Sequence, residues 1–381
     1  MTDQPDVSFD LHRALSRLIE LNGSDLHLKV PSQPLCRVDG DLVPIPGAEP
    51  LAAEDTDGAV RLMLGDDSVK LNEFDSDGEV DFAYAVAGLA RFRVNAFRQR
   101  GSVSIVMRAI PYGIKTIEEL DLPPVIRDLA EEERGIVLLT GTTGSGKSTT
   151  LASMIDHINS TKARHVVTVE DPIEFLHVDK RSVINQREIG MDTKDFKAAL
   201  RRVLRQDPDV ILIGEMRDPE TVWAALSAAE TGHLVLSTLH TMGAVETITR
   251  IIDFFPPFQQ QQVRMSVATS LKGIISQRLI ERSDHQGRIP AMEVLVNTGR
   301  VFDKIADGEA THELDEIIAD GEFYGMQTFD QALRNLYEQG IVTRRDALAT
   351  ATNSHDLRLK LDHLDLSRAQ ESLDGEASTT A

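Results

Sequence analysis

The spacing of hydrophobic and polar residues alternates between helical and strand-like periods over the first 110 residues. Residues 11–19 place leucine and isoleucine side chains on one face of a helix, which Ser8 or Asp10 could cap. Strand-like runs follow at residues 26–30, 35–38, 41–45, 91–100 and 102–110. Asp39-Gly40 is a type I′ hairpin signal between two of these runs. The pattern predicts a small α+β domain.

From Gly135 onward, continuous apolar runs alternate with helical segments. The predicted strands cover residues 135–140, 165–169, 209–213 and 233–237, and the predicted helices cover residues 147–159, 195–205 and 221–230. Strands that are apolar throughout are typical of a parallel sheet with helices on both faces, so this region is predicted to have an α/β fold. Past about residue 259 the apolar spacing predicts mainly helices.

Proline and glycine mark the boundary between these regions over residues 111–124, which we interpret as a linker. The prediction is therefore a first domain at residues 1–110 and a second at residues 125–345. A chain of 381 residues is long for one hydrophobic core, which favours the same division. Residues 346–381 form a C-terminal extension, and its end, residues 371–381, is small, polar and acidic, as in disordered termini.

A glycine-rich loop follows the first apolar strand of the second region. It reads Gly141, Thr142, Thr143, Gly144, Ser145, Gly146, Lys147 and Ser148, which fits the phosphate-binding loop pattern at every position, and Thr149 continues it into the helix. Glycines let successive backbone N–H groups surround phosphate oxygens, while Lys147 neutralises charge and the Ser148 hydroxyl ligates Mg²⁺. The following helix places its N-terminus at the phosphates. The loop predicts binding of ATP or GTP.

Two further strands end in carboxylates, with Glu170 and Asp171 after one and Glu215 after the other. In open α/β sheets the ligand lies beyond the carboxyl ends of the strands, so both acidic ends are expected to face the nucleotide. Such carboxylates hold Mg²⁺ or activate water, although acids after strands also serve as helix caps and surface ion pairs. Ser148, Asp171 and Glu215 are the predicted Mg²⁺ ligands, directly or through water. The sequence leaves open which carboxylate is the catalytic base.

His240 lies at the carboxyl end of the fourth strand. A lone histidine in a strand is more often a satisfied core residue. Its position at that end of the sheet favours a group that senses the γ-phosphate.

The composition and net charge of the chain limit which kinds of partner and metal site are expected. The net charge is −21, which disfavours non-specific binding to nucleic acid, because phosphate backbones are held by clustered Lys and Arg. No stretch reaches the roughly 18–20 apolar residues of a membrane span, so we predict a cytoplasmic protein, which another protein must hold in place if it works at a membrane. Cys36 is the single cysteine, which excludes an intrachain disulfide and a multi-cysteine zinc site. We interpret it as a small buried hydrophobe.

Four ordered motifs resemble the secretion and type IV pilus ATPase superfamily, and most closely its PilT-type pilus retraction ATPases. They are a Walker A motif at Gly141–Ser148, an Asp box at Val167–Glu174, a Walker B region at Asp207–Asp218 and a His box at Thr231–Thr241. Shorter similarities at residues 23–28, 91–95 and 325–328 extend the resemblance over roughly residues 10–345. The order and number of these motifs make the resemblance specific.

The resemblance implies a PAS-like N-terminal domain joined to a RecA-like P-loop ATPase core of the ASCE type, with a helical C-terminal region. It implies a homohexameric ring that binds ATP and Mg²⁺ between subunits and acts on an inner-membrane pilus platform protein. By the family's pattern Glu215 is the catalytic glutamate, with Glu170 and His240 near the γ-phosphate. Arg93 and Arg108 match the family's two arginines, 15 residues apart, that reach the phosphates. The predicted strands independently place both on polar positions, although solvated strand arginines are the alternative.

The direction of force is harder to predict. Extension and type II secretion ATPases usually carry a four-cysteine zinc insertion, which a chain with only Cys36 cannot form, and a long extra N-terminal domain, which we expect this protein to lack. Both features favour retraction. However, the segment Arg300–Ile305 keeps only two aliphatic positions of the corresponding retraction motif, Val301 and Ile305. An accessory role, a pilus assembly or secretion ATPase, and a RecA-like DNA translocase are the alternatives.

Overall fold

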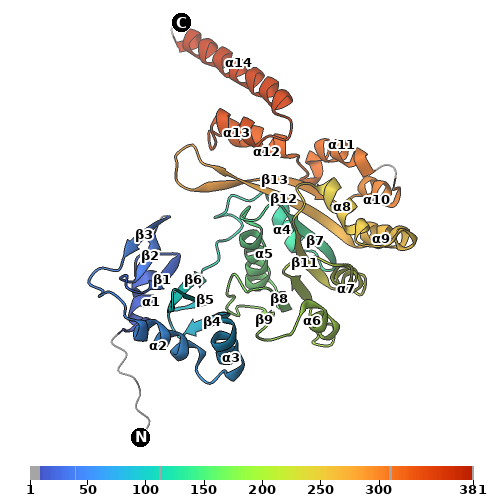
Figure 1. Ribbon diagram of the computed structural model, residues 1–381. Coiled ribbons are helices and arrows are strands. Elements are labelled where there is room, and N and C mark those ends of the chain that lie inside the picture. The colour runs from blue at the N-terminus through green and yellow to red at the C-terminus, as the bar shows by residue number, and fades with distance from the viewer. Residues whose placement is uncertain (1–8, 39, 111–112, 309–310, 380–381) are drawn as a thin grey trace. The chain divides into compact units, whose positions relative to one another are not determined.

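The computed structural model describes residues 9–38, 40–110, 113–308 and 311–379. The chain forms two compact units, Met1–Gly113 and Ile114–Ala381, each built around its own sheet (Figure 1). The fold is a mixed α/β fold in which both sheets are packed against helices.

The first unit contains a six-stranded sheet with strand order β3-β2-β1-β6-β5-β4 and antiparallel pairing throughout. The strands are β1 (Asp25–Lys29), β2 (Leu35–Val38), β3 (Asp41–Pro44), β4 (Glu79–Val86), β5 (Ala90–Gln99) and β6 (Ser102–Ile110). Its helices are α1 (Leu11–Glu20), α2 (Ala53–Leu64) and α3 (Ser68–Asp77). The core lies between these layers and includes the fully buried Phe92, Ile105 and Met107.

Most of the predicted elements of this unit are present. Asp10 caps α1 by accepting a hydrogen bond of 3.0 Å from the backbone N–H of Arg13. Strand β6 has the predicted bounds, whereas α2, α3 and β4 were not predicted. Asp39 of the predicted hairpin turn lies outside the described residues, although β2 and β3 pair as a hairpin. Cys36 is buried as predicted, and burial raises the pKa of its thiol to about 11.

The second unit contains a seven-stranded sheet with strand order β13-β12-β7-β11-β10-β8-β9. The strands are β7 (Gly135–Thr140), β8 (His165–Glu170), β9 (Val183–Glu188), β10 (Val210–Ile213), β11 (Leu234–Leu239), β12 (Leu271–Glu281) and β13 (Arg288–Val296). Every neighbouring pair is parallel except β12 with β13. The predicted mostly parallel sheet is therefore confirmed, and the four predicted strands match β7, β8, β10 and β11 within two residues.

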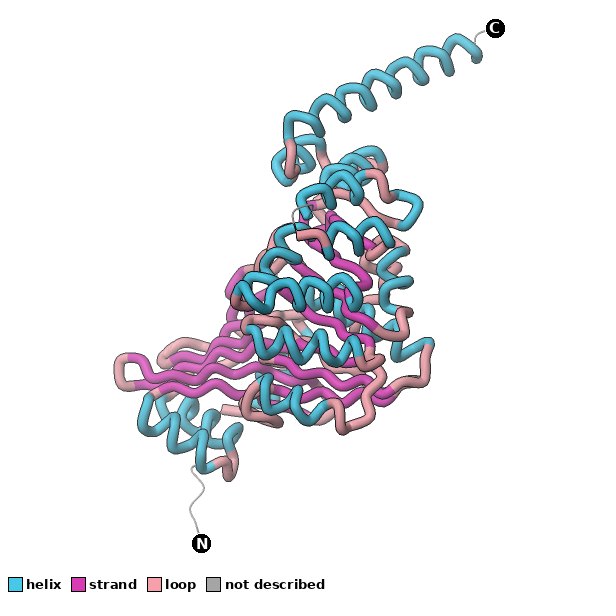
Figure 2. The backbone as a smooth tube through the Cα atoms, turned by 90° about the vertical axis from the view of Figure 1, so that its right-hand side faces the viewer, coloured by secondary structure: helices cyan, strands magenta, loops and turns pink. Residues whose placement is uncertain are grey.

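Helices cover both faces of this sheet, as the alternation of side chains along β7 shows. Ile136 and Leu138 join one buried cluster, with side chains from α6 (Phe196–Val203), α7 (Pro219–Glu230), α8 (Ala244–Asp253) and α9 (Pro257–Ser270). Val137 and Leu139 join another, with α4 (Val125–Ala130) and α5 (Lys147–Thr161). Figure 2 shows these helices layered against the strands. A strand buried on both faces has no polar face, which is why it reads as a continuous apolar run.

The prediction of mainly helices past residue 259 was wrong for β12 and β13. The two strands form a long antiparallel hairpin at the edge of the sheet, and β12 also pairs with β7. The apolar residues of β12, from Leu271 and Ile274 to Ile280, recur at a spacing that also fits one face of a helix, so the spacing favoured a helix. Pairing with β7, more than 130 residues earlier in the chain, decides between a helix and a strand.

The C-terminal part of the unit is helical, as predicted. It comprises α10 (Gly299–Ala306), α11 (Leu314–Ala319), α12 (Phe329–Glu338), α13 (Arg344–Thr350) and α14 (Ser354–Thr379), with short 3-10 helices at Thr311–Glu313 and Glu322–Tyr324. The expected disordered end overlaps α14, whose backbone is helical as far as Thr379 and which extends past the other helices (Figures 1 and 2). Among the described residues no helix is both long enough and apolar enough to cross a membrane.

Candidate nucleotide-binding site

Four parallel strands end at one edge of the second sheet. Strands β7, β11, β10 and β8 are consecutive neighbours, so their carboxyl ends lie together. The chain leaves these ends into the glycine-rich loop, His240, Glu215 and Asp171, respectively. The predicted groups from four separated parts of the sequence therefore meet in one place.

The glycines of the loop are required by close approach as well as by backbone conformation. Gly141 has φ +138°, and a Cβ at this position would lie 2.4 Å from the backbone oxygen of Gln277. Gly146 has φ +90°, and a Cβ there would lie 2.6 Å from the side-chain amide nitrogen of Gln277. Strand β12 therefore supports the loop from one side, and only glycine fits against it.

Lys147 lies at the start of α5 and is nearly buried, with 8% of its surface exposed. Its ammonium donates hydrogen bonds of 2.7 Å and 2.9 Å to the carbonyl oxygens of Gly141 and Thr142. Burial lowers the pKa of Lys147, and the nearby carboxylates of Glu174 and Glu215 oppose this effect. An ammonium has three N–H donors, so one remains for a phosphate oxygen.

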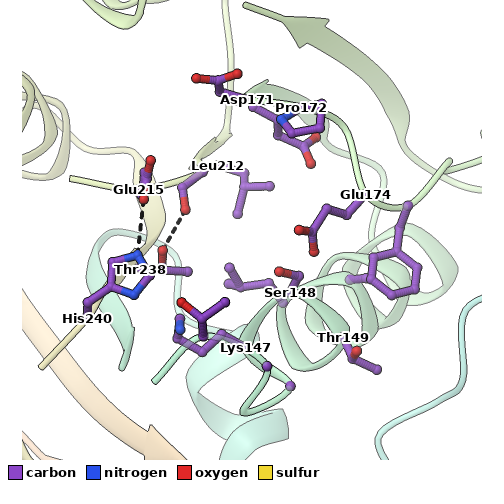
Figure 3. A pocket seen from close by; sticks show the side chains of 18 of the residues that line it. Lys147, Ser148, Thr149, Asp171, Pro172, Glu174, Leu212, Glu215, Thr238 and His240 are labelled. Atoms are coloured by element: carbon purple, nitrogen blue, oxygen red, sulfur yellow. Dashed lines mark hydrogen bonds and ion pairs between the residues drawn. The ribbon is translucent and has the colours of Figure 1, made fainter. Parts of the chain in front are cut away.

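A cavity of about 590 Å³ lies over the loop and the strand ends. Figure 3 shows Lys147 and Ser148 at its base, with Glu215 and His240 on one side and Glu174 on the other. Its lining includes Thr143, Gly144, Gly146, Lys147, Ser148, Thr149, Glu170, Asp171, Glu174, Glu215, Arg217, Thr238, His240 and Arg288. Gly141, Thr142 and Ser145, the other predicted nucleotide-binding residues, do not line this cavity, and the first two hold Lys147 instead.

Glu215 is held by two cationic or potentially cationic side chains. The Nε2 atom of His240 lies 3.2 Å from one carboxylate oxygen, and Arg217 forms an ion pair with the other. The Glu215 side chain is only 14% exposed, whereas His240 is 52% exposed. The buried carboxylate is therefore oriented by groups that are themselves open to solvent or to a ligand.

Glu170 has a different environment, although it lines the same cavity. Its Oε1 atom accepts hydrogen bonds of 2.6 Å from the Thr168 hydroxyl and 3.2 Å from the Gln186 amide. Loss of solvent raises the pKa of Glu170, and these hydrogen bonds only partly offset it. The carboxyl group of Glu170 consequently has a greater tendency to hold a proton than an ordinary glutamate does.

The oxygen donors of the cavity fit Mg²⁺, which prefers carboxylates, hydroxyls, water and phosphates. Ser148, Asp171 and Glu215, the predicted ligands, all line the same cavity. Across the part of the chain that the structure describes, no three Asp, Glu, His or Cys side chains are grouped to hold a metal ion. Ser148, Asp171 and Glu215 would be the groups that hold an Mg²⁺ ion here, directly or through water, beside the phosphates of a nucleotide.

Four of the residues named above as lining the cavity were not predicted as site residues. Glu174, Arg217 and Thr238 belong to motifs that were recognised, and their places in the Asp box, the Walker B region and the His box are the signals that could have identified them. Arg288 begins β13, and no sequence pattern connects it with the loop.

Arg93 and Arg108 belong to the first unit. They lie directly opposite each other on β5 and β6, at exposed positions, as the predicted strands required. On the other side of Arg108, β1 places Asp25 in register with it.

The raised pKa of Glu170 predicts a pH-dependent stability. The folded state retains a proton that the unfolded chain, with a glutamate pKa of about 4.3, releases as pH rises, so the contribution of Glu170 to stability falls above that pH. The Glu170→Gln variant cannot ionise. We expect its free energy of unfolding, measured by urea denaturation from pH 5 to pH 8, to increase relative to that of the wild type as the pH rises.

Glu230→Gln, on the exposed end of α7, is the matched control and should follow the wild type at each pH. A constant difference between Glu170→Gln and the wild type across this range would contradict the assigned environment of Glu170.

Comparison with known proteins agrees with this geometry. The family model of the type II/IV secretion system protein matches residues 2–349. The type IV pilus retraction ATPase PilT of Pseudomonas aeruginosa is 43% identical over 338 residues, covering 89% of this chain and 97% of the relative. The type IV pilus ATPase PilU of the same organism is 42% identical over 352 residues, covering 92% and 91%.

A crystal structure of the pilus retraction motor PilT with bound ADP superposes with a TM-score of 0.85 and 41% identity, and the match covers 92% of this chain and 99% of that one. The chain therefore belongs to the type II/IV secretion system protein family, as an ATPase that resembles the pilus retraction ATPases.

Proposed function

We propose that this chain is one subunit of a homohexameric motor that hydrolyses ATP to retract a type IV pilus, acting through an inner-membrane platform protein from the cytoplasmic side. The observation that carries the proposal is the similarity of almost the whole chain to the retraction motor PilT, together with the convergence of four motifs on one cavity. In this proposal the first unit is a PAS-like domain and the second a RecA-like core with C-terminal helices.

The glycine-rich loop binds the phosphates of ATP. Its backbone N–H groups and the remaining donor of Lys147 approach the phosphate oxygens, and the N-terminus of α5 adds favourable dipole charge. Mg²⁺, when bound, neutralises charge on the transferred phosphoryl group, with Ser148 as its protein ligand. Thr149 follows at the first turn of α5 and lines the same cavity.

Glu215 is the residue we assign to orient and deprotonate the attacking water. Its carboxylate is mostly buried, lies at the end of β10 and is oriented by His240 and Arg217. Glu170 is less suited to act as the base, because its desolvated carboxyl already tends to hold a proton in the ground state and one of its oxygens accepts two hydrogen bonds. We assign Glu170 to positioning and His240 to sensing the γ-phosphate.

The chemical site also needs arginine to stabilise charge in the transition state. Arg93 and Arg108 are the proposed source, and they act on ATP bound by a neighbouring subunit of the ring. The two arginines lie directly opposite each other at exposed positions, so together they offer two guanidinium groups to one anionic ligand such as a phosphate.

The segment that departs from the retraction motif does not argue against the fold of a retraction ATPase. Val301 and Ile305, the two aliphatic positions that it keeps, are the buried residues of α10 and are fully inaccessible to solvent. Arg300 is exposed, and Phe302 is only partly buried. The departures therefore change the surface of α10 more than its packing.

Replacement of Glu215 tests the assigned base. Glu215→Gln removes the proton acceptor at nearly constant volume, so kcat should fall by roughly 10²–10⁴-fold while binding of a fluorescent ATP analogue is retained. Lys147→Ala should instead abolish both binding and turnover, and Glu230→Gln should resemble the wild type. Undiminished turnover by Glu215→Gln would move the base to another group, with Glu170 the first candidate.

A deletion strain tests the direction of force. Loss of a retraction motor should leave excess surface pili without twitching motility, and wild-type protein should restore motility where Glu215→Gln does not. Microscopy of pili and a motility assay on the same strains provide the measurement. Loss of surface pili in the deletion strain would instead assign this chain to pilus assembly.

A further inference from the structure

A buried carboxylate lies beneath Arg108 in the first unit. Asp25 on β1 is in register with Arg108 on β6, and its Oδ1 atom accepts a hydrogen bond of 2.8 Å from the arginine Nε. The other oxygen, Oδ2, accepts a hydrogen bond of 2.7 Å from the Ser24 hydroxyl. Both oxygens of the carboxylate are therefore fixed, and the carboxylate in turn fixes the near edge of the guanidinium.

The exposure of the two partners is unequal. The Asp25 side chain is 6% exposed, whereas the Arg108 side chain is 68% exposed. Only Nε of Arg108 is engaged within the described residues, so its two terminal nitrogens carry four N–H donors toward solvent. The contact leaves free the edge of the guanidinium that forms bidentate hydrogen bonds with phosphate.

Stability alone does not account for this arrangement. Burying a carboxylate costs desolvation energy, and an ion pair with an exposed arginine returns little of it. Burial by itself would raise the pKa of Asp25, but the hydrogen bonds from Ser24 and Arg108 and the arginine charge hold it below the usual range. Asp25 is therefore an anion under Arg108 at neutral pH.

Arg93 explains why such an anion is needed. It lies directly opposite Arg108 and forms no ion pair with a carboxylate among the described residues, so the two like charges repel each other across β5 and β6. Arg37, which faces Asp25 from β2, donates instead to the carbonyl oxygen of Gly40. Asp25 is thus the carboxylate that holds Arg108 in place against the repulsion.

We propose that Asp25 is a positioning residue for Arg108: by binding Nε, it aims the two terminal nitrogens of the guanidinium as a preformed fork at the phosphates of ATP on another subunit. This inference rests on the proposed function, in which Arg108 acts across the subunit interface. An arginine held in place loses less rotamer freedom when it engages the phosphate, so the contact is expected to raise kcat.

Steady-state ATPase kinetics of the full-length chain test the proposal. Asp25→Asn keeps the shape and one acceptor but removes the charge, and kcat should fall about tenfold with KM for ATP changed less than about twofold. Asp81→Asn, an exposed aspartate on β4 of the same sheet, is the matched control and should retain wild-type kcat. Should Asp25→Asn fail to assemble, Ser24→Ala removes only the support of Oδ2 and should lower kcat about threefold.

The double variant separates positioning from a structural role. In an Arg108→Ala background, Asp25→Asn should cause no further loss of kcat, because its target is gone. An equal loss in both backgrounds, or wild-type kcat in Asp25→Asn or Ser24→Ala, would overturn the inference. Wild-type kcat in Arg108→Ala would overturn the proposed role of Arg108 itself, which is a separate failure.

Discussion

The parallel pairing of β7, β11, β10 and β8 is the constraint on which the site depends. Parallel neighbours must end at the same edge, so this pairing brings a glycine-rich loop, two acidic strand ends and a histidine together from residues 141 to 240. The strands are buried on both faces by two separate hydrophobic clusters. The positions of the polar groups are therefore fixed by an apolar core that none of them belongs to.

The same constraint creates an electrostatic arrangement that a nucleotide can complete. Lys147 is nearly buried, and the carboxylates of Glu174 and Glu215 act against the effect of that burial on its pKa. Glu215 is oriented by His240 and Arg217, while Glu170 is desolvated and bonded to its neighbours. Two glutamates at adjacent strand ends thus have different properties, which follow from their surroundings and not from their chemistry.

Much of this could be predicted from the sequence, because local patterns specify it. Strand β7 and the start of α5 were predicted at their observed bounds, since an apolar run, a glycine-rich loop and a helix follow one another. Strands β12 and β13 were not predicted, because the spacing of apolar residues in a buried strand can also fit a buried helix until the partner strand is known. Gln277 against the loop and Arg288 in the cavity depend on that hairpin, and neither has a signal of its own.

The contact between Asp25 and Arg108 could not be predicted for a similar reason. The two residues are 83 positions apart, and only the register of β1 with β6 brings them together. The sequence did predict that Arg93 and Arg108 occupy exposed strand positions, because alternation along a strand is local. Register between strands distant in the chain is set by packing of the whole sheet.

The central claim is that the loop of one subunit and an arginine of another form one catalytic site. Mixing Lys147→Ala, which is inactive, with Arg108→Ala, which has a much reduced kcat, under conditions that allow rings to exchange subunits tests it most directly. Mixed rings restore an intact loop facing an intact arginine at about a quarter of their interfaces, because neighbouring subunits in a closed ring make head-to-tail contacts. The account predicts that the ATPase activity of the mixture exceeds the sum of the two separate activities. An activity no higher than that sum in demonstrably mixed rings would contradict it.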